Sequence, residues 1–205
     1  TEMPRLGRLV MLDLPRPQEV AQVPVWSRAL TRGAAPTGRS GHGAVLHEGL
    51  MYVFGGFSYD DTIAKNPWPA RSLDSVFRYM PKEDKWEMVA VMPRRRSSHV
   101  CEVIGDKAYL IGGWDGTPIG IGVTKGQFVS AIDVFDFNSL KFKPSCLEFS
   151  LLSKRRAFSS TIYNDRITVV GGLGYEGYMS SDLFSDVIAL EFPENECMEI
   201  PKNDK

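Results

Sequence analysis

Short apolar runs, separated by turn-forming residues, recur in pairs along this chain. The paired runs occupy residues 43–46 with 51–54, 100–104 with 108–111, and 159–163 with 167–170. Gly, Asp or Asn separates the two runs of each pair, which predicts a β-hairpin. Because the runs are almost continuously apolar, we expect both faces of these strands to be covered.

A Gly-Gly doublet ends the second run of every pair. The doublets begin at residues 55, 112 and 171, so one repeat is 57 residues long and the next is 59. Sixteen residues before the doublets stand three arginines: Arg39, Arg96 and Arg155. Glycine at a strand end suits a backbone that turns sharply or passes close to a neighbour. The pattern therefore predicts one β-rich unit that occurs three times.

Each unit continues with a long polar segment and two further apolar runs. The polar segments cover residues 57–72, 114–130 and 173–185, and we expect them to be loops. Third strands are expected at residues 76–79, 132–135 and 187–190. Seven residues beyond the ends of these runs stand Trp86, Phe142 and Cys197, which head the expected fourth strands.

The beginning of the chain has the pattern of an incomplete unit. Residues 9–14 and 25–30 look like third and fourth strands whose first two strands are absent. No stretch combines helical periodicity with convincing caps. We therefore predict an all-β fold of fourteen strands in one continuous repeat array. Its units are residues 1–34, which hold the outer two strands of the incomplete unit, then 35–92, 93–150 and 151–205.

These features resemble the kelch repeat. Its marks are Gly-Gly after the second strand, an aromatic residue near the end of the third strand, and a Trp about seven residues later. The first full unit carries its doublet, Tyr79 and Trp86, the second substitutes Phe135 and Phe142, and the third keeps only its doublet. The resemblance covers nearly the whole chain. It implies a kelch-type β-propeller, in which four-stranded antiparallel blades surround a central channel.

About three and a half blades cannot close a ring, because a blade needs a neighbour on each side to bury its faces. Two readings remain open. The chain is either a partial propeller, completed by further kelch blades from the rest of a longer chain, or a composite one, completed by a second chain.

The topology brings the repeated arginines and the long polar segments together. In an antiparallel meander, the segment before the first strand and the segment between the second and third strands lie on the same face, here called the loop face. Long loops on a rigid β scaffold often carry binding, and aromatic and Arg side chains often dominate interface energy. The predicted partner-contacting residues are Arg39, Arg95, Arg96, Arg155, Arg156, Tyr59, Asp60, Trp68, Trp114, Asp115, Tyr175 and Tyr178.

Two roles are open for these side chains. A guanidinium matches carboxylates and phosphates in two-point geometry, and the kelch resemblance implies that such arginines face acidic peptides or chain-terminal carboxylates. Alternatively, each arginine pairs with an acidic residue of the adjoining blade, a role that is favoured for Arg39. The aromatic residues, among them Phe128, either contact the partner or pack beneath the loops.

Composition and charge narrow the classes of partner. With 24 Lys+Arg, 25 Asp+Glu and a pI near 6.3, the chain has no bulk electrostatic reason to bind nucleic acid or an acidic membrane surface. Cys101, Cys146 and Cys197 lack CxxC spacing and are expected to be reduced, buried thiols. No apolar run is long enough for a membrane span and no signal-peptide core is present. These features favour an intracellular location, cytoplasmic or nuclear.

No pattern typical of catalysis or metal binding is apparent. His42 and His99 occupy one repeat position, where the third unit has Phe158, so neither is expected to be a metal ligand or a base. His47 is expected at the surface without an acidic partner. We predict no metal and no cofactor.

The sequence thus predicts a non-enzymatic protein–protein interaction module or adaptor, which presents the loop face to a protein or peptide. Substrate recognition for a ubiquitin ligase is a specific case of this function. One alternative is a propeller enzyme or lectin-like domain that acts on a small sugar. A second alternative is a structural subunit of a large assembly.

Overall fold

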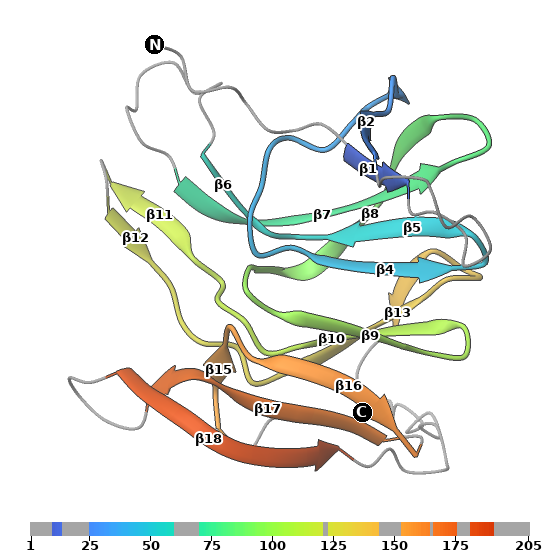
Figure 1. Ribbon diagram of the computed structural model, residues 1–205. Helices are drawn as coiled ribbons and strands as arrows, with labels where there is room; N and C mark the ends of the chain where they lie inside the picture. The colour runs from blue at the N-terminus through green and yellow to red at the C-terminus, as the bar shows by residue number, and fades with distance from the viewer. Residues whose placement is uncertain are drawn as a thin grey trace, which may run out of the picture.

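The computed structural model describes residues 10–13, 25–59, 70–120, 123–143, 153–164, 166–175 and 181–190. Every regular element in these ranges is a β-strand. The strands form mainly antiparallel, twisted sheets that are stacked side by side (Figure 1). The predicted all-β fold is confirmed.

Blade 1 is the sheet with strand order β4-β5-β7-β8. Its strands are β4 (Gly43–His47), β5 (Leu50–Phe54), β7 (Ala70–Met80) and β8 (Lys85–Arg96). Glu48 (φ 47°) and Gly49 (φ 75°) connect β4 to β5. Two consecutive residues with positive φ are typical of the type I′ turn, whose twist matches that of the strands it joins.

Blade 2 repeats this arrangement with strand order β9-β10-β13-β14. Its strands are β9 (Val100–Ile104), β10 (Lys107–Ile111), β13 (Ile132–Asp136) and β14 (Lys141–Lys143). Phe135 pairs with Phe142 across β13 and β14, with ring centroids 5.1 Å apart. Tyr79 and Trp86 pair in the same way in blade 1, at 5.0 Å. The seven-residue spacing therefore places the two aromatic marks opposite each other across a turn.

Blade 3 contains β16 (Ser159–Tyr163), β17 (Arg166–Tyr175) and β18 (Ser181–Leu190), with β17 in the middle. The short strand β15 (Arg155–Arg156) also pairs with β17. The fourth strand predicted at Cys197 lies outside the described residues.

The three long polar segments were expected to be loops, and the structure corrects this expectation. In blade 1, β6 (Phe57–Tyr59) pairs with the first residues of β7. In blade 2, β11 (Thr117–Gly120) pairs with β12 (Val123–Lys125), and in blade 3 the hairpin of β17 and β18 continues past the glycine doublet. Backbone groups that leave the blade pair with each other and thereby satisfy their hydrogen bonds. Each of these segments thus contains a β-hairpin extension within its described part.

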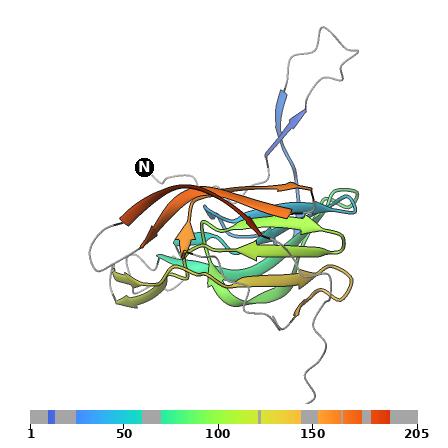
Figure 2. The same cartoon turned by 90° about the horizontal axis from the view of Figure 1, so that it is seen from below.

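The N-terminal strands form a small sheet of their own. Strand β1 (Val10–Asp13) pairs antiparallel with β2 (Val25–Arg28), close to the predicted bounds. This hairpin projects from the stacked sheets (Figure 2), and the Trp26 side chain in it is 66% exposed. The short strand β3 (Arg32–Gly33) then runs parallel to β8.

Hydrophobic cores fill the spaces between successive blades. The core between blades 1 and 2 is built from Tyr52, Phe54, Val76, Met92, Ala108, Leu110, Phe135 and Phe137. The core between blades 2 and 3 is built from Ile111, Ile132, Phe158, Ile167 and Val169. Alternate residues of β10 face opposite neighbours, because Leu110 belongs to the first core and Ile111 to the second. Because these cores hold the blades against one another, the segments of the loop face have defined positions relative to the blades.

Candidate functional site

The repeated arginines share one hydrogen bond. Arg39 Nη1 donates to the carbonyl of Gly55 at 2.8 Å, Arg96 Nη1 to that of Gly112 at 2.7 Å, and Arg155 Nη1 to that of Gly171 at 2.9 Å. The constant sixteen-residue spacing therefore has a physical reason. Each arginine ties the segment before the first strand to the first glycine of its own doublet.

The same arginines find further partners within the third strands. Arg96 Nε and Nη2 donate to Asp133 Oδ2 at 3.1 and 2.5 Å, and Arg155 bonds both carboxylate oxygens of Asp186 at 2.6 and 2.9 Å. The sequence leaves open whether these two arginines pair with an acid of the adjoining blade. Such pairing holds for Arg96, the last residue of β8 in blade 1, because its partner Asp133 lies in β13 of blade 2. It does not hold for Arg155, because β15 and Asp186 both belong to the sheet of blade 3. For Arg39, pairing with an acid of the adjoining blade was the favoured role, and this is wrong: its side-chain partner is a hydroxyl of its own blade, Ser75 Oγ at 3.2 Å.

Burial gives Arg96 and Arg155 an intramolecular role. Both side chains are fully buried, and burial lowers the pKa of Arg96 while the nearby Asp133 carboxylate opposes that shift. Arg39 is partly buried, which lowers its pKa to about 10 and leaves it charged at neutral pH. A buried guanidinium needs its acceptors, because unpaired charge in the interior is costly. Contact between these three side chains and a partner stays a prediction.

The N–H of the second glycine in each of the first two doublets bonds the repeated arginine that follows it in the chain. Gly56 N–H donates to the carbonyl of Arg96, and Gly113 N–H to that of Arg155, both at 2.8 Å. At Gly113 (φ 100°) a Cβ atom would lie 2.8 Å from the carbonyl oxygen of Ser97. The close backbone approach expected from the doublets is confirmed.

Arg156 differs from its repeat equivalents, which are Ser40 and Ser97. Its Cζ lies 5.6 Å from the ring centroid of Trp114 and 5.7 Å from that of Phe128. The two rings meet edge to face at 5.1 Å. Its Nε–H is buried without a hydrogen-bond partner, and no carboxylate among the described residues is in ion-pair contact with it. We call Trp114, Phe128 and Arg156 the aromatic–arginine cluster.

The cluster spans two blades. Arg156 lies in β15, whereas Trp114 and Phe128 flank the β11–β12 hairpin of blade 2, and β15 lies near the base of that hairpin (Figure 1). Backbone bonds fix this base: Asp115 N–H donates to the carbonyl of Gln127 at 3.1 Å, and Asp115 Oδ1 accepts Gln127 N–H at 2.6 Å. The cluster therefore unites two of the predicted loop-face positions, Trp114 and Arg156, and a third, Asp115, lies at the base of the hairpin beside them.

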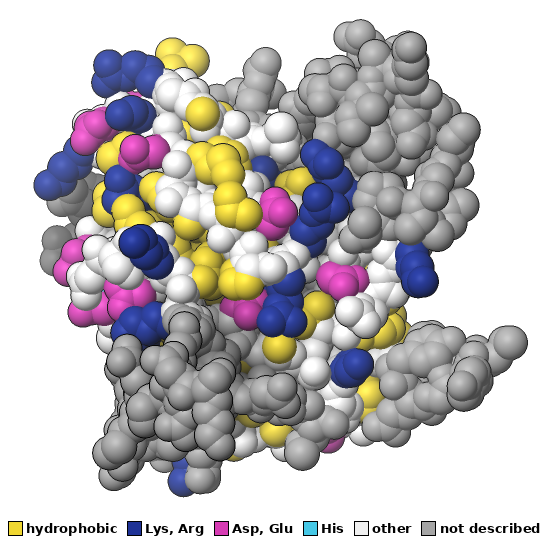
Figure 3. All heavy atoms as spheres, turned by 180° about the vertical axis from the view of Figure 1, so that it is seen from behind, with side chains coloured by type: hydrophobic (Ala, Val, Ile, Leu, Met, Phe, Trp, Pro, Cys, Tyr) yellow, Lys and Arg dark blue, Asp and Glu magenta, His cyan; other side chains and the backbone are white. Residues whose placement is uncertain are grey.

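Two further arginines lie at the end of β8. Arg95 Nε lies 3.6 Å from Asp74 Oδ2, and both side chains are partly exposed. Arg94 Nε donates to Asp133 Oδ2 at 3.1 Å and so links blade 1 to blade 2. Lys and Arg are interspersed with Asp and Glu on the rear surface (Figure 3), in keeping with the balanced composition.

The remaining predicted contact residues are placed only in part. The backbones of Tyr59 and Tyr175 end β6 and β17. Asp60, Trp68 and Tyr178 lie outside the described residues. The sequence reasoning did not single out Asp133 or Asp186, although an acidic residue within or just before a third strand was an available signal.

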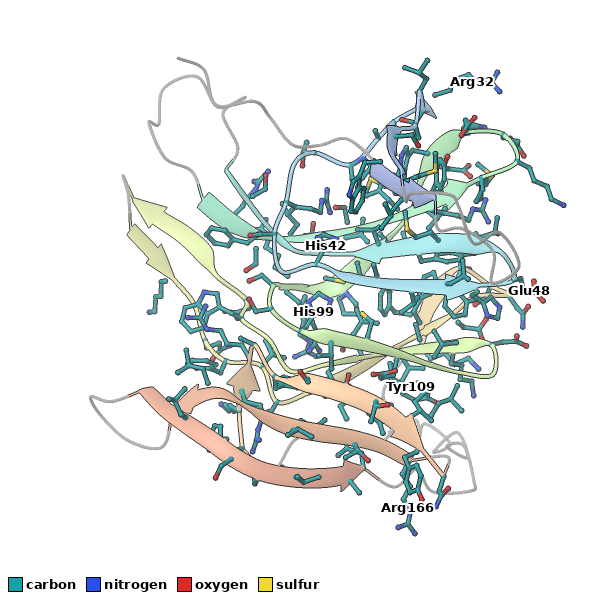
Figure 4. All side chains as sticks on the ribbon, in the orientation of Figure 1. Arg32, His42, Glu48, His99, Tyr109 and Arg166 are labelled. Carbon is teal, nitrogen blue, oxygen red and sulfur yellow. The ribbon has the colours of Figure 1, made fainter. Side chains whose placement is uncertain are left out.

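The histidines occupy different environments. His42 and His99 lie at corresponding places in successive sheets (Figure 4). His99 is buried, neither ring nitrogen has a hydrogen-bond partner, and burial together with the charge of Arg96 lowers its pKa to about 3. The expectation for His47 is wrong: its ring stacks on Phe137 at 4.1 Å, and Nε2 lies 3.5 Å from Asp106 Oδ1.

The described residues contain neither a metal-binding group nor a membrane-spanning helix. Within them, no three His, Cys, Asp or Glu side chains are grouped so that they could hold a metal ion. The same part of the chain contains no helix with the length and hydrophobicity of a membrane span.

Comparison with known proteins agrees with this architecture. The human protein Host cell factor 2 is 32% identical over 98 residues, which cover 43% of this chain and 11% of that protein. Bovine Kelch domain-containing protein 3 is 31% identical over 116 residues, 54% of this chain and 27% of that protein. Mouse Multiple epidermal growth factor-like domains protein 8 is 27% identical over 188 residues, 86% of this chain and 6% of that protein. The chain thus spans only a small part of each of these relatives.

A solved structure shows the same fold. The structure of YjhT superimposes with a TM-score of 0.64 at 18% identity, over 81% of this chain and 52% of that one. The KLHDC2/KLHL20/DRC7 Kelch-repeats domain matches residues 8–205. Kelch repeat domains are generally protein–protein interaction modules without enzymatic activity of their own. The glycine doublets, the paired aromatics and this match over nearly the whole length agree, and the chain belongs to the KLHDC2/KLHL20/DRC7 Kelch-repeats domain family.

Proposed function

We propose that this chain is the partner-recognition part of a kelch propeller and that it binds a peptide segment at the loop face, at the aromatic–arginine cluster. The observation that carries the proposal is Arg156, a guanidinium held against two aromatic rings without a carboxylate partner among the described residues. The equivalent positions in blades 1 and 2 hold serines, so the architecture of the blade does not require an arginine there.

The chemistry of the cluster favours a peptide that bears carboxylate groups. A guanidinium presents a planar fork of N–H donors that matches a carboxylate in two-point geometry. Trp114 and Phe128 add apolar contact area, and aromatic and Arg side chains are frequent hot spots. Arg95, which shares a partly exposed ion pair with Asp74, supplies a second cation on the same face.

We further propose an adaptor role in the cytoplasm or nucleus, with substrate selection for a ubiquitin ligase as its specific form. In that role this chain holds the substrate, and another region or protein provides the link to the ligase. Support comes from membership of the kelch family and from the free thiol of Cys101. Burial raises the pKa of this thiol and keeps it protonated.

We also propose that further kelch blades, from the rest of a longer chain or from a second chain, complete the propeller. Exposed apolar side chains of blade 3 support this, because Val170, Val187 and Leu183 are 43%, 67% and 84% exposed. Exposed apolar area of this kind marks a surface that another element covers.

The test is peptide display against the 205-residue chain, followed by affinity measurement for the selected peptides. We expect acidic residues to be enriched. We also expect Arg156→Glu to weaken binding about 30-fold, as for a hot spot of about 2 kcal/mol. Lys154→Glu, at an exposed lysine two residues away, is the control with the same charge change. Selected peptides that bind Arg156→Glu as tightly as the parent chain would exclude the cluster as the site.

A further inference from the structure

The indole of Trp114 rests on a residue that has no side chain. A Cβ atom at Gly126 would lie 2.6 Å from Cε2 and 2.8 Å from Cζ2 of Trp114, and 2.7 Å from Cα of Gly116. Contacts between carbon atoms are optimal at about 3.5–4.0 Å, so no side chain fits at this position while the indole stays in place. The seat of Trp114 is therefore the bare backbone at Gly126.

The backbone around this seat is held firmly. Asp115 and Gln127 exchange two hydrogen bonds, Trp114 and Phe128 form an isolated β-bridge, and Val129 N–H donates to the carbonyl of Gly113 at 2.9 Å. Gly126 itself is not in the left-handed region. A substitution at Gly126 therefore acts through steric contact, and a new Cβ would press on both the indole of Trp114 and the backbone at Gly116.

Displacement of the indole reaches Arg156 directly. The guanidinium is held by Trp114 at 5.6 Å and by Phe128 at 5.7 Å, and the two rings contact each other. In the described part of the chain the Nε–H of Arg156 is buried without a hydrogen-bond partner that could anchor the guanidinium instead. The orientation of this cation toward a ligand thus depends on where the indole lies.

We propose that Gly126 is a positioning residue of the binding site, which seats Trp114 and through it orients Arg156 for a carboxylate ligand. This inference rests on the proposed function. It assigns a role to a residue that contacts no ligand and that bears none of the kelch marks. The arrangement resembles the supporting contacts that preorganise other sites, where loss of a support loosens the geometry and not the fold.

The test compares the parent chain with Gly126→Ala by NMR. Aromatic rings shift the resonances of a cation that lies over them, so the Nε–H signal of Arg156 reports its position relative to Trp114 and Phe128. We expect this signal to move to the shift of a solvent-exposed arginine in Gly126→Ala. The probe ligand is acetyl-Asp-Asp-amide, whose affinity we expect to fall about tenfold in the variant. Gln127→Ala is the neighbouring control, because it changes an exposed side chain and keeps the backbone N–H that bonds Asp115.

A second variant distinguishes an effect that passes through the indole from a general loss of folding. In a Trp114→Leu background the indole is absent and only the contact with Cα of Gly116 remains, so the effect of Gly126→Ala on the Arg156 signal and on probe affinity is expected to be much smaller than in the parent chain. An Arg156 signal that is the same in the parent and in Gly126→Ala would overturn the inference. A signal that moves while probe affinity stays constant would overturn the role of Gly126 in binding. In a third outcome, the parent chain does not bind the probe but the Arg156 signal still moves in Gly126→Ala. This outcome would refute the carboxylate ligand of the proposed function, whereas the role of Gly126 in seating Trp114 would stand.

Discussion

At the scale of single residues, the arginines of the loop face fall into two groups that the repeat itself distinguishes. Arg39, Arg96 and Arg155 occur in every blade and donate to the first glycine carbonyl of the doublet. Arg156 has serines at its equivalent positions and lies against aromatic rings instead. A feature that every blade retains serves what all blades share, namely folding. A feature confined to one blade is free to serve recognition.

His99 gives a prediction about pH. Its pKa is lowered to about 3 in the folded protein by burial and by the charge of Arg96, whereas an unfolded histidine titrates near 6.5. The stabilising effect of the neutral ring is therefore fully present above pH 6.5 and is lost as the pH falls toward 3. We expect the free energy of unfolding to fall by at most about 1.4 kcal/mol per pH unit from this group. Urea denaturation at intervals from pH 7.5 to 5 measures the slope.

The matched variant is His99→Phe, because Phe158 is buried at the equivalent position of blade 3. Phenylalanine does not titrate, so the stability of the variant is expected to depend less steeply on pH over this range. Parallel stability curves for the parent and the variant would show that His99 is not the group responsible. Any change in stability at pH 7.5 does not affect the comparison, since only the slopes are compared.

The repeated arginines and glycines can be predicted from the sequence, but the residues that bond the arginines cannot. The Arg to Gly-Gly spacing is visible as a repeat, yet the hydrogen bond that explains it depends on how the strands fold together. The acidic partners occur at irregular offsets: Asp133 lies 21 residues after Gly112, and Asp186 lies 15 residues after Gly171. Sequence alignment in register therefore does not bring them together. The stacking of His47 on Phe137 is likewise a contact between blades, which one sequence does not reveal.

At the scale of elements, side-chain hydrogen bonds connect the third strand to the segment that precedes the first strand. In blade 2 the fastening is the Asp133 carboxylate, which is almost fully buried and accepts bonds from Arg94 and Arg96. Removal of one partner from a buried pair leaves the other charge uncompensated. We expect Asp133→Ala to lower the free energy of unfolding by about 3 kcal/mol. Urea denaturation followed by circular dichroism measures this loss.

Asp74→Ala provides the comparison, since Asp74 forms a partly exposed ion pair with Arg95 at 3.6 Å. Exposed pairs contribute little, so this change is expected to cost less than about 0.5 kcal/mol. Equal losses of unfolding free energy in the two variants would mean that the buried Asp133 carboxylate contributes no more to stability than an exposed ion pair.

The hairpin extensions show where element prediction from sequence ends. The core strands are predictable because apolar runs and turn residues alternate with a clear period. The segments after the doublets are polar and contain turn-forming residues such as Pro, Gly, Asp and Ser, so their composition predicts loops. Their strands arise from pairing with the neighbouring segment, as in Phe57 with Ser72 and Leu173 with Leu183. Such pairing depends on the geometry of the blade and is only weakly encoded in local sequence.

At the scale of the whole molecule, the blades form a linear array in which each contacts its immediate neighbours. The core between blades 1 and 2 contains four aromatic rings, Tyr52, Phe54, Phe135 and Phe137. The core between blades 2 and 3 is aliphatic apart from Phe158. Blade 3 also exposes the apolar side chains of Val187 and Leu183. In such arrays stability is approximately a sum over blades and the interfaces between them, so local opening starts where these terms are smallest.

We therefore expect amide hydrogen exchange to follow the order of the blades. Amides of β16, β17 and β18 should exchange faster than those of β5 and β10 in the isolated 205-residue chain, measured by mass spectrometry of peptides at neutral pH. Ile167→Val sharpens the test, because Ile167 is fully buried in the core between blades 2 and 3. Loss of one methyl group there costs about 1 kcal/mol, which corresponds to about fivefold faster exchange. This acceleration is expected in blade 3 and not in β4 and β5. If the variant accelerates exchange equally in all three blades, the chain opens as one cooperative unit and the description as an array of separable blades is wrong.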